Sequence, residues 1–204
     1  LERSVDEVDF DGSQVFSRDG SSAIRLKDIG NRVMCNNGKA LEVTTSHSSP
    51  VSPPPFMVGM AEIEMDMETY EYELIDFVAV VDCGTPINPN LVRVQTEGGL
   101  GQGIGMAMFE DVTRSQKGRV FENSFMQYKL PTRMDVGHLQ VEFESSYEPT
   151  GPFGVKSIGE VVINTPSPAI AGAVANASGV WIRELPITAE KIFTEMKEKK
   201  KAVN

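Results

Sequence analysis

The chain has few of the residues from which metal sites and disulfide frameworks are built. Its 204 residues include two cysteines, two histidines and one tryptophan. Neither Cys35 nor Cys83 has another cysteine or a histidine at ligand spacing, and His47 and His138 are far apart. The sequence therefore excludes a disulfide framework and a zinc site. We expect both cysteines to be buried thiols in a reducing, cytoplasmic environment.

Sustained basic surfaces and long apolar runs are also lacking. The net charge is −10, and the one basic cluster consists of residues near the end of the chain: Lys197, Lys199, Lys200 and Lys201. Nucleic-acid binders need a basic face to neutralise phosphates, so we expect no nucleic acid among the partners. No stretch approaches the roughly 20 apolar residues that span a bilayer, so we expect no membrane segment.

The sequence does contain an ordinary globular composition, with 40% hydrophobic and 24% charged residues. Residue patterns predict a set of strands and a set of helices. The strands are expected over 5–10, 14–17, 40–45, 56–67, 72–82, 120–128, 139–146 and 180–182, and the helices over 22–33, 91–110, 166–177 and from 188 onward. Strand pairs mixed with helices, without a regular strand–helix repeat, indicate an α+β fold with mixed or antiparallel sheets.

Three segments are predicted along the chain. Residues 1–50 read as a strand and short-helix part of the same unit, 51–193 as the main domain and 194–204 as a charged tail. The stretch from Ser46 to Pro55, almost entirely Ser, Pro and His, is the connection after the first segment. Because the chain starts at Leu1 without a methionine, we expect it to be part of a longer protein.

The turn Gly154–Glu160 carries one carboxylate at the end of a flexible, nearly uncharged segment. Pro166 is a helix start signal, and Thr165 or Ser167 is expected to cap that helix. We therefore expect Glu160 in a tight loop before a buried helix, where desolvation would raise its pKa and suit it to act as a base. The alternative is a solvated loop glutamate, the commoner state of acidic side chains.

Lys156, four residues before Glu160, is expected to form an ion pair or to hold the loop in shape. Ser157 is a poor nucleophile candidate, because no histidine lies near it in sequence. Asp82 and Asn88 are expected to cap the loop that they enclose and the helix that follows it.

The expected helix over 91–110 contains an unusual number of glycines: Gly98, Gly99, Gly101, Gly103 and Gly105. Each costs about 1 kcal/mol relative to alanine, so something must approach the helix backbone closely. One interpretation is tight packing against another element. The other is contact with a flat or phosphate-bearing cofactor, to which Gln102 would offer both an amide donor and an acceptor. The G-x-G-x-x-G register of dinucleotide-binding folds does not occur, which disfavours a nucleotide-binding domain.

The segments VAVVDCGTPINPNLVRVQTEGGLGQGIGMAMFED and GPFGVKSIGEVVINTPSPAIAGAVANASGVWIRELPITAEKI, in this order, resemble a known family. It is the xanthine dehydrogenase and aldehyde oxidase family, in the C-terminal part of its molybdenum-binding region. Three motifs carry the resemblance: Asp-x-Gly-x-x-Ile-Asn-Pro, Gly-Gly-x-x-Gln-Gly and Gly-x-Lys-x-x-Gly-Glu. The resemblance covers about residues 50–193, and the first 50 less clearly.

The resemblance implies an oxidoreductase that hydroxylates a carbon of a purine, another N-heterocycle or an aldehyde with oxygen from water. It implies molybdopterin as the cofactor and Glu160 as the general base. It also implies that Gln102, Gly103 and Gly159 contact the cofactor. Iron-sulfur clusters and a flavin, FAD, would remove the electrons and would be carried outside this chain.

The chain departs from a complete family member in what it lacks. The family's earlier Gly-Gly-x-Glu-x-Gly-Gln-Gly segment, which grips the other side of the pterin, would lie before Leu1. We therefore expect about half of a cofactor pocket, and an isolated chain that is empty and inactive. The expected partners are the rest of the molybdenum domain, the electron-transfer domains or subunits and a small-molecule substrate, with a homodimer as an alternative. A non-catalytic assembly or cofactor-delivery module is the alternative function.

Overall fold

The computed structural model describes residues 1–37, 42–46 and 48–203. Its contacts divide the chain into two units, Leu1–Ser48 and Ser49–Asn204. The strand expected over 40–45 lies partly outside the described residues, and residues 42–45 carry no strand.

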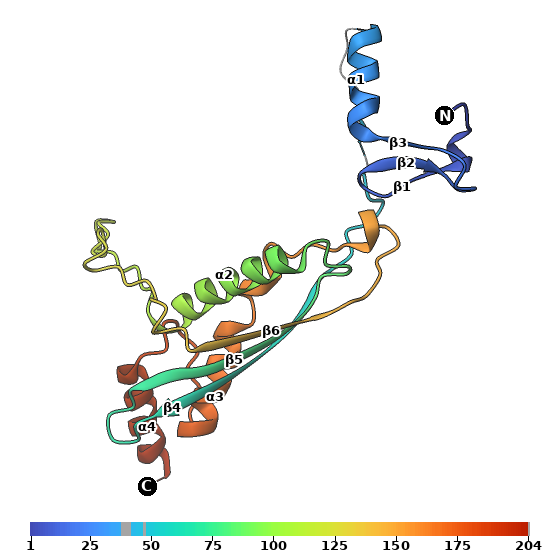
Figure 1. Cartoon of the computed structure of the whole chain (residues 1–204). Helices are drawn as coiled ribbons and strands as arrows, with labels where there is room; N and C mark the ends of the chain where they lie inside the picture. Colours follow the sequence, from blue (N-terminus) through green and yellow to red (C-terminus); the bar gives the residue numbers. More distant parts are fainter. Residues whose placement is uncertain (38–41, 47, 204) are drawn as a thin grey trace. The chain divides into compact units, whose positions relative to one another are not determined.

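The first unit is a small antiparallel sheet followed by one helix (Figure 1). A 3₁₀ turn leads into the strands and the helix, whose bounds are η1 Val5–Glu7, β1 Val8–Phe10, β2 Gln14–Ser17, β3 Ala23–Arg25 and α1 Leu26–Asn37. The hairpin between β1 and β2 is confirmed. The helix expected over 22–33 is wrong at its start, because residues 23–25 pair with β2. It is also wrong at its end, because the helix continues to Asn37.

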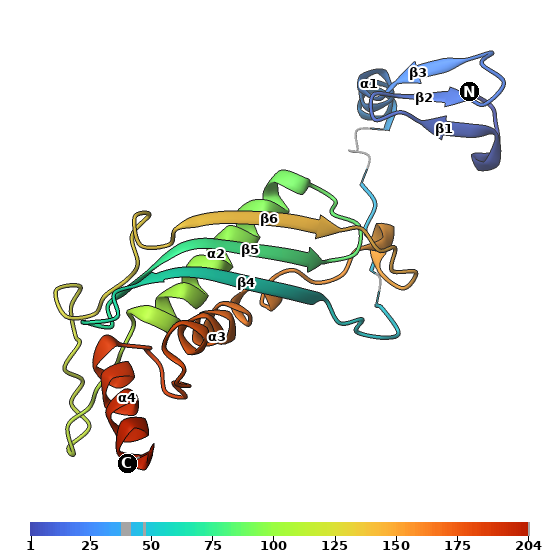
Figure 2. The same ribbon diagram turned by 90° about the horizontal axis from the view of Figure 1, so that it is seen from below.

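The second unit is a three-stranded sheet with two helices against one face (Figures 1 and 2). Its strands, in spatial order, are β4 Phe56–Met65, β5 Tyr72–Asp82 and β6 His138–Glu144. The central strand β5 runs antiparallel to β4 and parallel to β6. The remaining elements are α2 Pro89–Met108, the 3₁₀ turns η2 Pro152–Gly154 and η3 Val161–Ile163, α3 Pro166–Ser178 and α4 Ala189–Val203. The α+β class predicted from the sequence is confirmed.

The core lies between the sheet and the helices α2 and α3. Its fully buried side chains come from all three elements: Phe77 and Val81 of β5, Leu100 and Ile104 of α2, and Ile170 and Val174 of α3. Within the described residues, five large apolar side chains of β4 and β5 are exposed instead: Phe56, Val58, Met60, Ile75 and Val80. The prediction that β5 lies inside the sheet is therefore confirmed, while only one of its faces is covered.

Some expected elements do not form. The segment over 120–128 has no strand in this fully described stretch, and a single bridge joins Arg114 and Val120. Residues 180–182 also lack a strand, although Val180 and Ile182 are buried. The last helix begins as expected, since the Lys191 amide donates to Thr188 Oγ1 (3.3 Å), and it includes most of the predicted charged tail.

Two further expectations concern burial and the membrane. Cys83 is buried as predicted, but Cys35 is exposed, because none of the α1 residues from 26 to 36 is buried. Among the described residues, no helix combines the length and the apolar character that crossing a membrane requires.

Candidate functional site

The loop after β5 leads directly into the glycine-rich helix α2. Asp82 Oδ1 accepts a hydrogen bond from the Gly84 amide (3.0 Å), and Asn88 Oδ1 accepts one from the Leu91 amide (3.2 Å). Pro89 occupies the first helical position, where its missing N–H costs nothing. Both predicted caps are therefore confirmed.

The turn that carries Glu160 is joined to this loop. The Lys156 amide donates to the Cys83 carbonyl (2.7 Å), and the Thr85 amide donates to the Gly154 carbonyl (2.8 Å). Lys156 Nζ lies 2.6 Å from Asp82 Oδ2. The expected ion pair of Lys156 is thus confirmed, with a partner that the sequence did not indicate.

Asp82 is held as a carboxylate by its donors. Lys156 and then Ser146, whose hydroxyl lies 2.6 Å from Asp82 Oδ1, lower the pKa of Asp82 to about 2. The Lys156 and Asp82 side chains are 11% and 20% exposed, so solvent screens this pair less than a surface pair.

One side of α2 is packed so tightly that only glycine fits. A Cβ on Gly99 would overlap Val162 Cγ2, and a Cβ on Gly103 would lie 2.6 Å from Pro166 Cγ. We call these two positions the packed side of α2. Packing therefore accounts for glycine at 99 and 103, whereas a cofactor contact of Gly103 stays a prediction.

A second side of α2 carries glycines that packing does not explain. At Gly98 and Gly101 no atom of the described residues lies within 4 Å of the place a Cβ would occupy, and the same holds for Gly159. Gln95 Nε2 donates to the Gly159 carbonyl (3.1 Å). Gln102 is exposed two helical turns further on, roughly 10 Å along the axis. This open side of α2 (Gly98, Gly101 and Gln102) presents bare backbone at the two glycines and one exposed amide side chain at Gln102, beside the Glu160 turn.

Glu160 itself is exposed, so the expectation that this chain desolvates its carboxylate is wrong. It stands at the N-cap position of η3, where its carbonyl accepts from the Ile163 amide (3.2 Å). Val162, rather than Glu160, takes the buried position and packs on Gly99. Within the described residues, Glu160 is the solvated loop glutamate that the sequence left as an alternative.

The side-chain cap expected for α3 is also wrong. Thr165 occupies the N-cap position without a capping hydrogen bond, and its hydroxyl instead points to Met57 Sδ at 3.6 Å. Pro166 is the first residue of the helix, as predicted.

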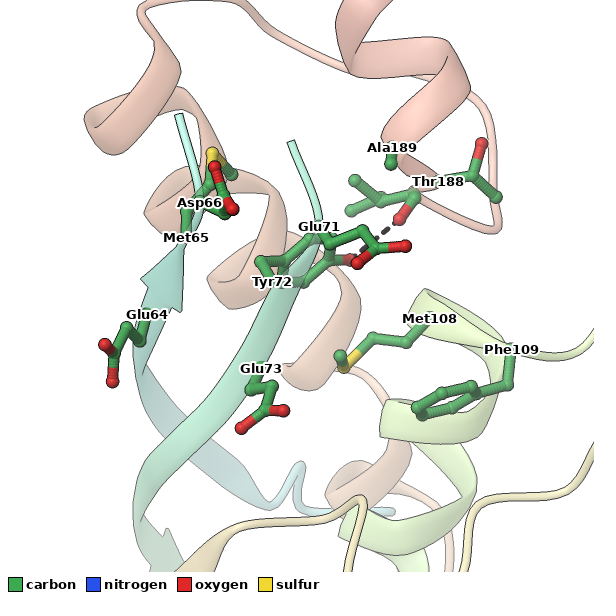
Figure 3. A pocket seen from close by; sticks show the side chains of 11 residues that line it. Glu64, Met65, Asp66, Glu71, Tyr72, Glu73, Met108, Phe109, Thr188 and Ala189 are labelled. Atoms are coloured by element: carbon green, nitrogen blue, oxygen red, sulfur yellow. Dashed lines mark hydrogen bonds between the residues drawn. The ribbon is translucent and has the colours of Figure 1, made fainter. Parts of the chain in front are cut away.

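A cavity of about 710 Å³ lies at the other end of β5, away from the predicted site (Figure 3). Carboxylates gather around it, from Glu64, Asp66, Glu71 and Glu73. In its wall Tyr72 donates its hydroxyl to the Ile187 carbonyl (2.8 Å), and burial raises the pKa of that phenol above its usual value. None of the predicted site residues lines this cavity.

The three motifs of the resemblance all lie in the second unit, whose fold is the one expected for that part of a molybdenum-binding region. The molybdopterin cofactor-binding domain matches residues 1–137, which is more than half of the chain. The chain therefore belongs to the molybdopterin cofactor-binding domain family. This match includes the first 50 residues, where the resemblance was less clear in the sequence.

Individual relatives agree with this assignment. "Probable hypoxanthine oxidase XdhD" from Escherichia coli (strain K12) is 35% identical over 159 residues, which cover 76% of this chain and 16% of that protein. The xanthine dehydrogenase molybdenum-binding subunit of Escherichia coli O157:H7 is 33% identical over 159 residues, 78% of this chain and 21% of that protein. Quinoline 2-oxidoreductase from Pseudomonas putida 86 has a TM-score of 0.82 at 26% identity, covering 97% of this chain and 26% of that one.

The chain thus spans about a quarter or less of the length of these relatives. Within the part of the chain that the structure describes, no three His, Cys, Asp or Glu side chains converge as metal ligands.

Proposed function

We propose that this chain forms one wall of the cofactor site of a molybdenum hydroxylase. The enzyme would hydroxylate a carbon of a purine, another N-heterocycle or an aldehyde with oxygen from water. The observation that carries the proposal is the open side of α2, which lies beside the Glu160 turn in a chain of the molybdopterin-binding family.

The residues of this open side suit a flat polar group. Gly98 and Gly101 leave the backbone accessible, and Gly159 does the same on the facing turn. The Gln102 amide can donate to one ring atom and accept from another. Gln102, Gly103 and Gly159 would therefore contact molybdopterin, Gly103 through its backbone, since Pro166 leaves no room for a side chain at that position. When bound, the molybdenum cofactor supplies the redox chemistry.

Glu160 would be the general base. Its side chain is exposed and directly follows Gly159, so it can accept a proton from a reactant held against the open side. Covering by the rest of the protein would shield this carboxylate from water, as is usual for a catalytic base.

The proposed protein partners follow from the fact that this chain covers about a quarter or less of the length of its relatives. The other wall of the pocket would come from the rest of the molybdenum domain, and the electrons would pass to iron-sulfur clusters and FAD held elsewhere. The names of the relatives refer to hypoxanthine, xanthine and quinoline, which favours an N-heterocycle as the substrate. Two free cysteines fit a reducing compartment, so we propose a cytoplasmic location.

The test is Glu160→Gln in the intact protein that contains this chain. We expect kcat to fall about 100- to 10,000-fold with the molybdenum content unchanged, because the amide keeps the shape and cannot accept the proton. Glu198→Gln, at an exposed position of α4, is the matched control and should leave kcat unchanged. Activity of Glu160→Gln within about tenfold of the parent would contradict the assignment.

A non-catalytic assembly or cofactor-delivery module is the second candidate. The exposure of Glu160 in the described chain favours it, because a catalytic base is normally shielded from water. It predicts that the intact parent protein binds the cofactor but turns over no purine, N-heterocycle or aldehyde. An activity assay of the intact, unmutated protein with these substrates separates the two candidates: turnover supports the enzyme, and its absence with cofactor bound supports the module.

A further inference from the structure

We propose that Lys156 and Gln95 are positioning residues that fix the Glu160 turn, Lys156 to the end of β5 and Gln95 to α2. The first contact, the Lys156 anchor, joins Lys156 to Asp82. The second, the Gln95 anchor, joins Gln95 to the carbonyl of Gly159. The catalytic consequence rests on the proposed function, whereas the contacts themselves are independent of it.

The Lys156 anchor joins residues that are 74 positions apart in the chain. It ends on a carboxylate whose two oxygens are both used, since Asp82 accepts from Lys156 Nζ, Ser146 Oγ and the Gly84 amide. Because Asp82 is the last residue of β5, the start of the Glu160 turn is fixed to the central strand of the sheet.

Backbone contacts strengthen the Lys156 anchor. Gly84 and Val155 form an antiparallel bridge, between the two hydrogen bonds that Lys156 and Thr85 make with the facing segment. Gly84 has a φ of +69°, and a Cβ there would overlap the Gly154 carbonyl oxygen. The two segments therefore meet at backbone distance, and Lys156 cannot shift without breaking this bridge.

The Gln95 anchor acts on the peptide unit of Glu160 itself. The carbonyl that accepts from Gln95 belongs to Gly159, and its peptide bond ends at the nitrogen of Glu160. Because a peptide unit is planar, restricting the rotation of that carbonyl also restricts the direction of the Glu160 N–Cα bond. Beyond Glu160, Val162 packs on Gly99 and holds the far end of the turn on the same helix.

Glu160 is therefore an exposed side chain on a fixed backbone. Contacts at Lys156, Gly159 and Val162 hold the backbone on both sides of it, so few residues between them are without a contact to α2 or β5. A displacement of about 1 Å in a reacting group can lower a rate about 100-fold, so this rigidity matters for a base even though the anchors never touch a reactant.

The test uses Lys156→Met and Gln95→Met in the intact protein, with Lys117→Met and Gln116→Met as matched controls on a segment remote from the turn. Hydrogen exchange is measured by mass spectrometry over peptides covering 150–163. In the same proteins KM is measured, and kcat is calculated per bound molybdenum. We expect Lys156→Met to speed exchange over 154–160 about tenfold or more and to lower kcat about 10- to 100-fold, with KM within about threefold. Gln95→Met should produce the same pattern with smaller changes.

A merely structural role would lower the melting temperature and leave kcat per folded, molybdenum-loaded molecule unchanged. Unchanged exchange over 154–160 in both variants overturns the proposal, as does a kcat within about twofold of the parent. If Glu160→Gln retains activity while the exchange of the anchor variants still rises, the proposed function fails and the two contacts stand.

Discussion

The packed side and the open side of α2 differ in what holds them in place. Gly99 and Gly103 meet Val162 and Pro166 of the same chain, so their environment is complete. Gly101 and Gln102 meet open space or solvent within the described residues, as does Glu160 on the neighbouring turn. The chain therefore completes the packing of one side itself and leaves the residues that we propose for chemistry exposed. Changes on the packed side should alter stability, and changes on the open side should alter function.

The largest change in stability is expected on the packed side. Gly99→Ala should lower the free energy of unfolding by about 1–3 kcal/mol, because the new Cβ overlaps Val162 and the stiff valine cannot give way without moving η3. Urea unfolding of the chain measures this. A variant as stable as the parent would show that α2 and η3 are not in close contact.

The Lys156–Asp82 ion pair is expected to make a smaller contribution to stability, and one that depends on pH. The pKa of Asp82 is lowered from its ordinary value of 3.8 to about 2, chiefly by Lys156. The unfolded chain therefore binds the proton first as the pH falls. The contribution of Asp82 to the free energy of unfolding is fully present above about pH 5 and is lost as the pH falls to about 2.

Over that interval the parent should lose about 1–2 kcal/mol more stability than Asp82→Asn, which has no carboxylate to protonate there. Urea unfolding of both proteins between pH 5 and pH 2 measures the difference. Parallel pH profiles for the two proteins would contradict the role assigned to the Lys156–Asp82 pair.

The smallest effect, and the one of opposite sign, is expected on the open side. Gly101→Ala meets no atom within 4 Å among the described residues, and alanine is the better helix former. We expect the free energy of unfolding to rise by roughly 0.5–1 kcal/mol. Together with Gly99→Ala this gives a pair of identical substitutions, two positions apart, with opposite signs. A loss of stability at 101 would remove the distinction between the two sides.

Local signals in the sequence predicted much of the fold. The alternation over 56–67 predicted β4, and the run over 72–82, apolar at its centre, predicted β5. The helix expected over 91–110 is α2, which begins two residues earlier, at Pro89. The prediction failed where pairing with a distant segment decides the structure. Residues 23–25 continue the spacing of α1, yet they pair with β2 and form a strand.

The same limit applies to the candidate site. The resemblance of the motifs made Glu160 and Gln102 the predicted site residues, but the exposure of these side chains depends on neighbours that a local pattern does not encode. The partner of Lys156 is 74 residues away, so its identity could not be read from the turn. Gln95 had no signal at all, because a side-chain bond to one backbone carbonyl leaves no repeating pattern in the sequence.

The attachment of the Glu160 turn to Asp82 also bears on how a reactant would reach it. Segments that open easily have few buried contacts and few protected hydrogen bonds. This turn ends instead on the central strand of the sheet through a shielded ion pair and a backbone bridge. It is thus unsuited to act as a lid, and any gate that admits a substrate must be formed by other segments.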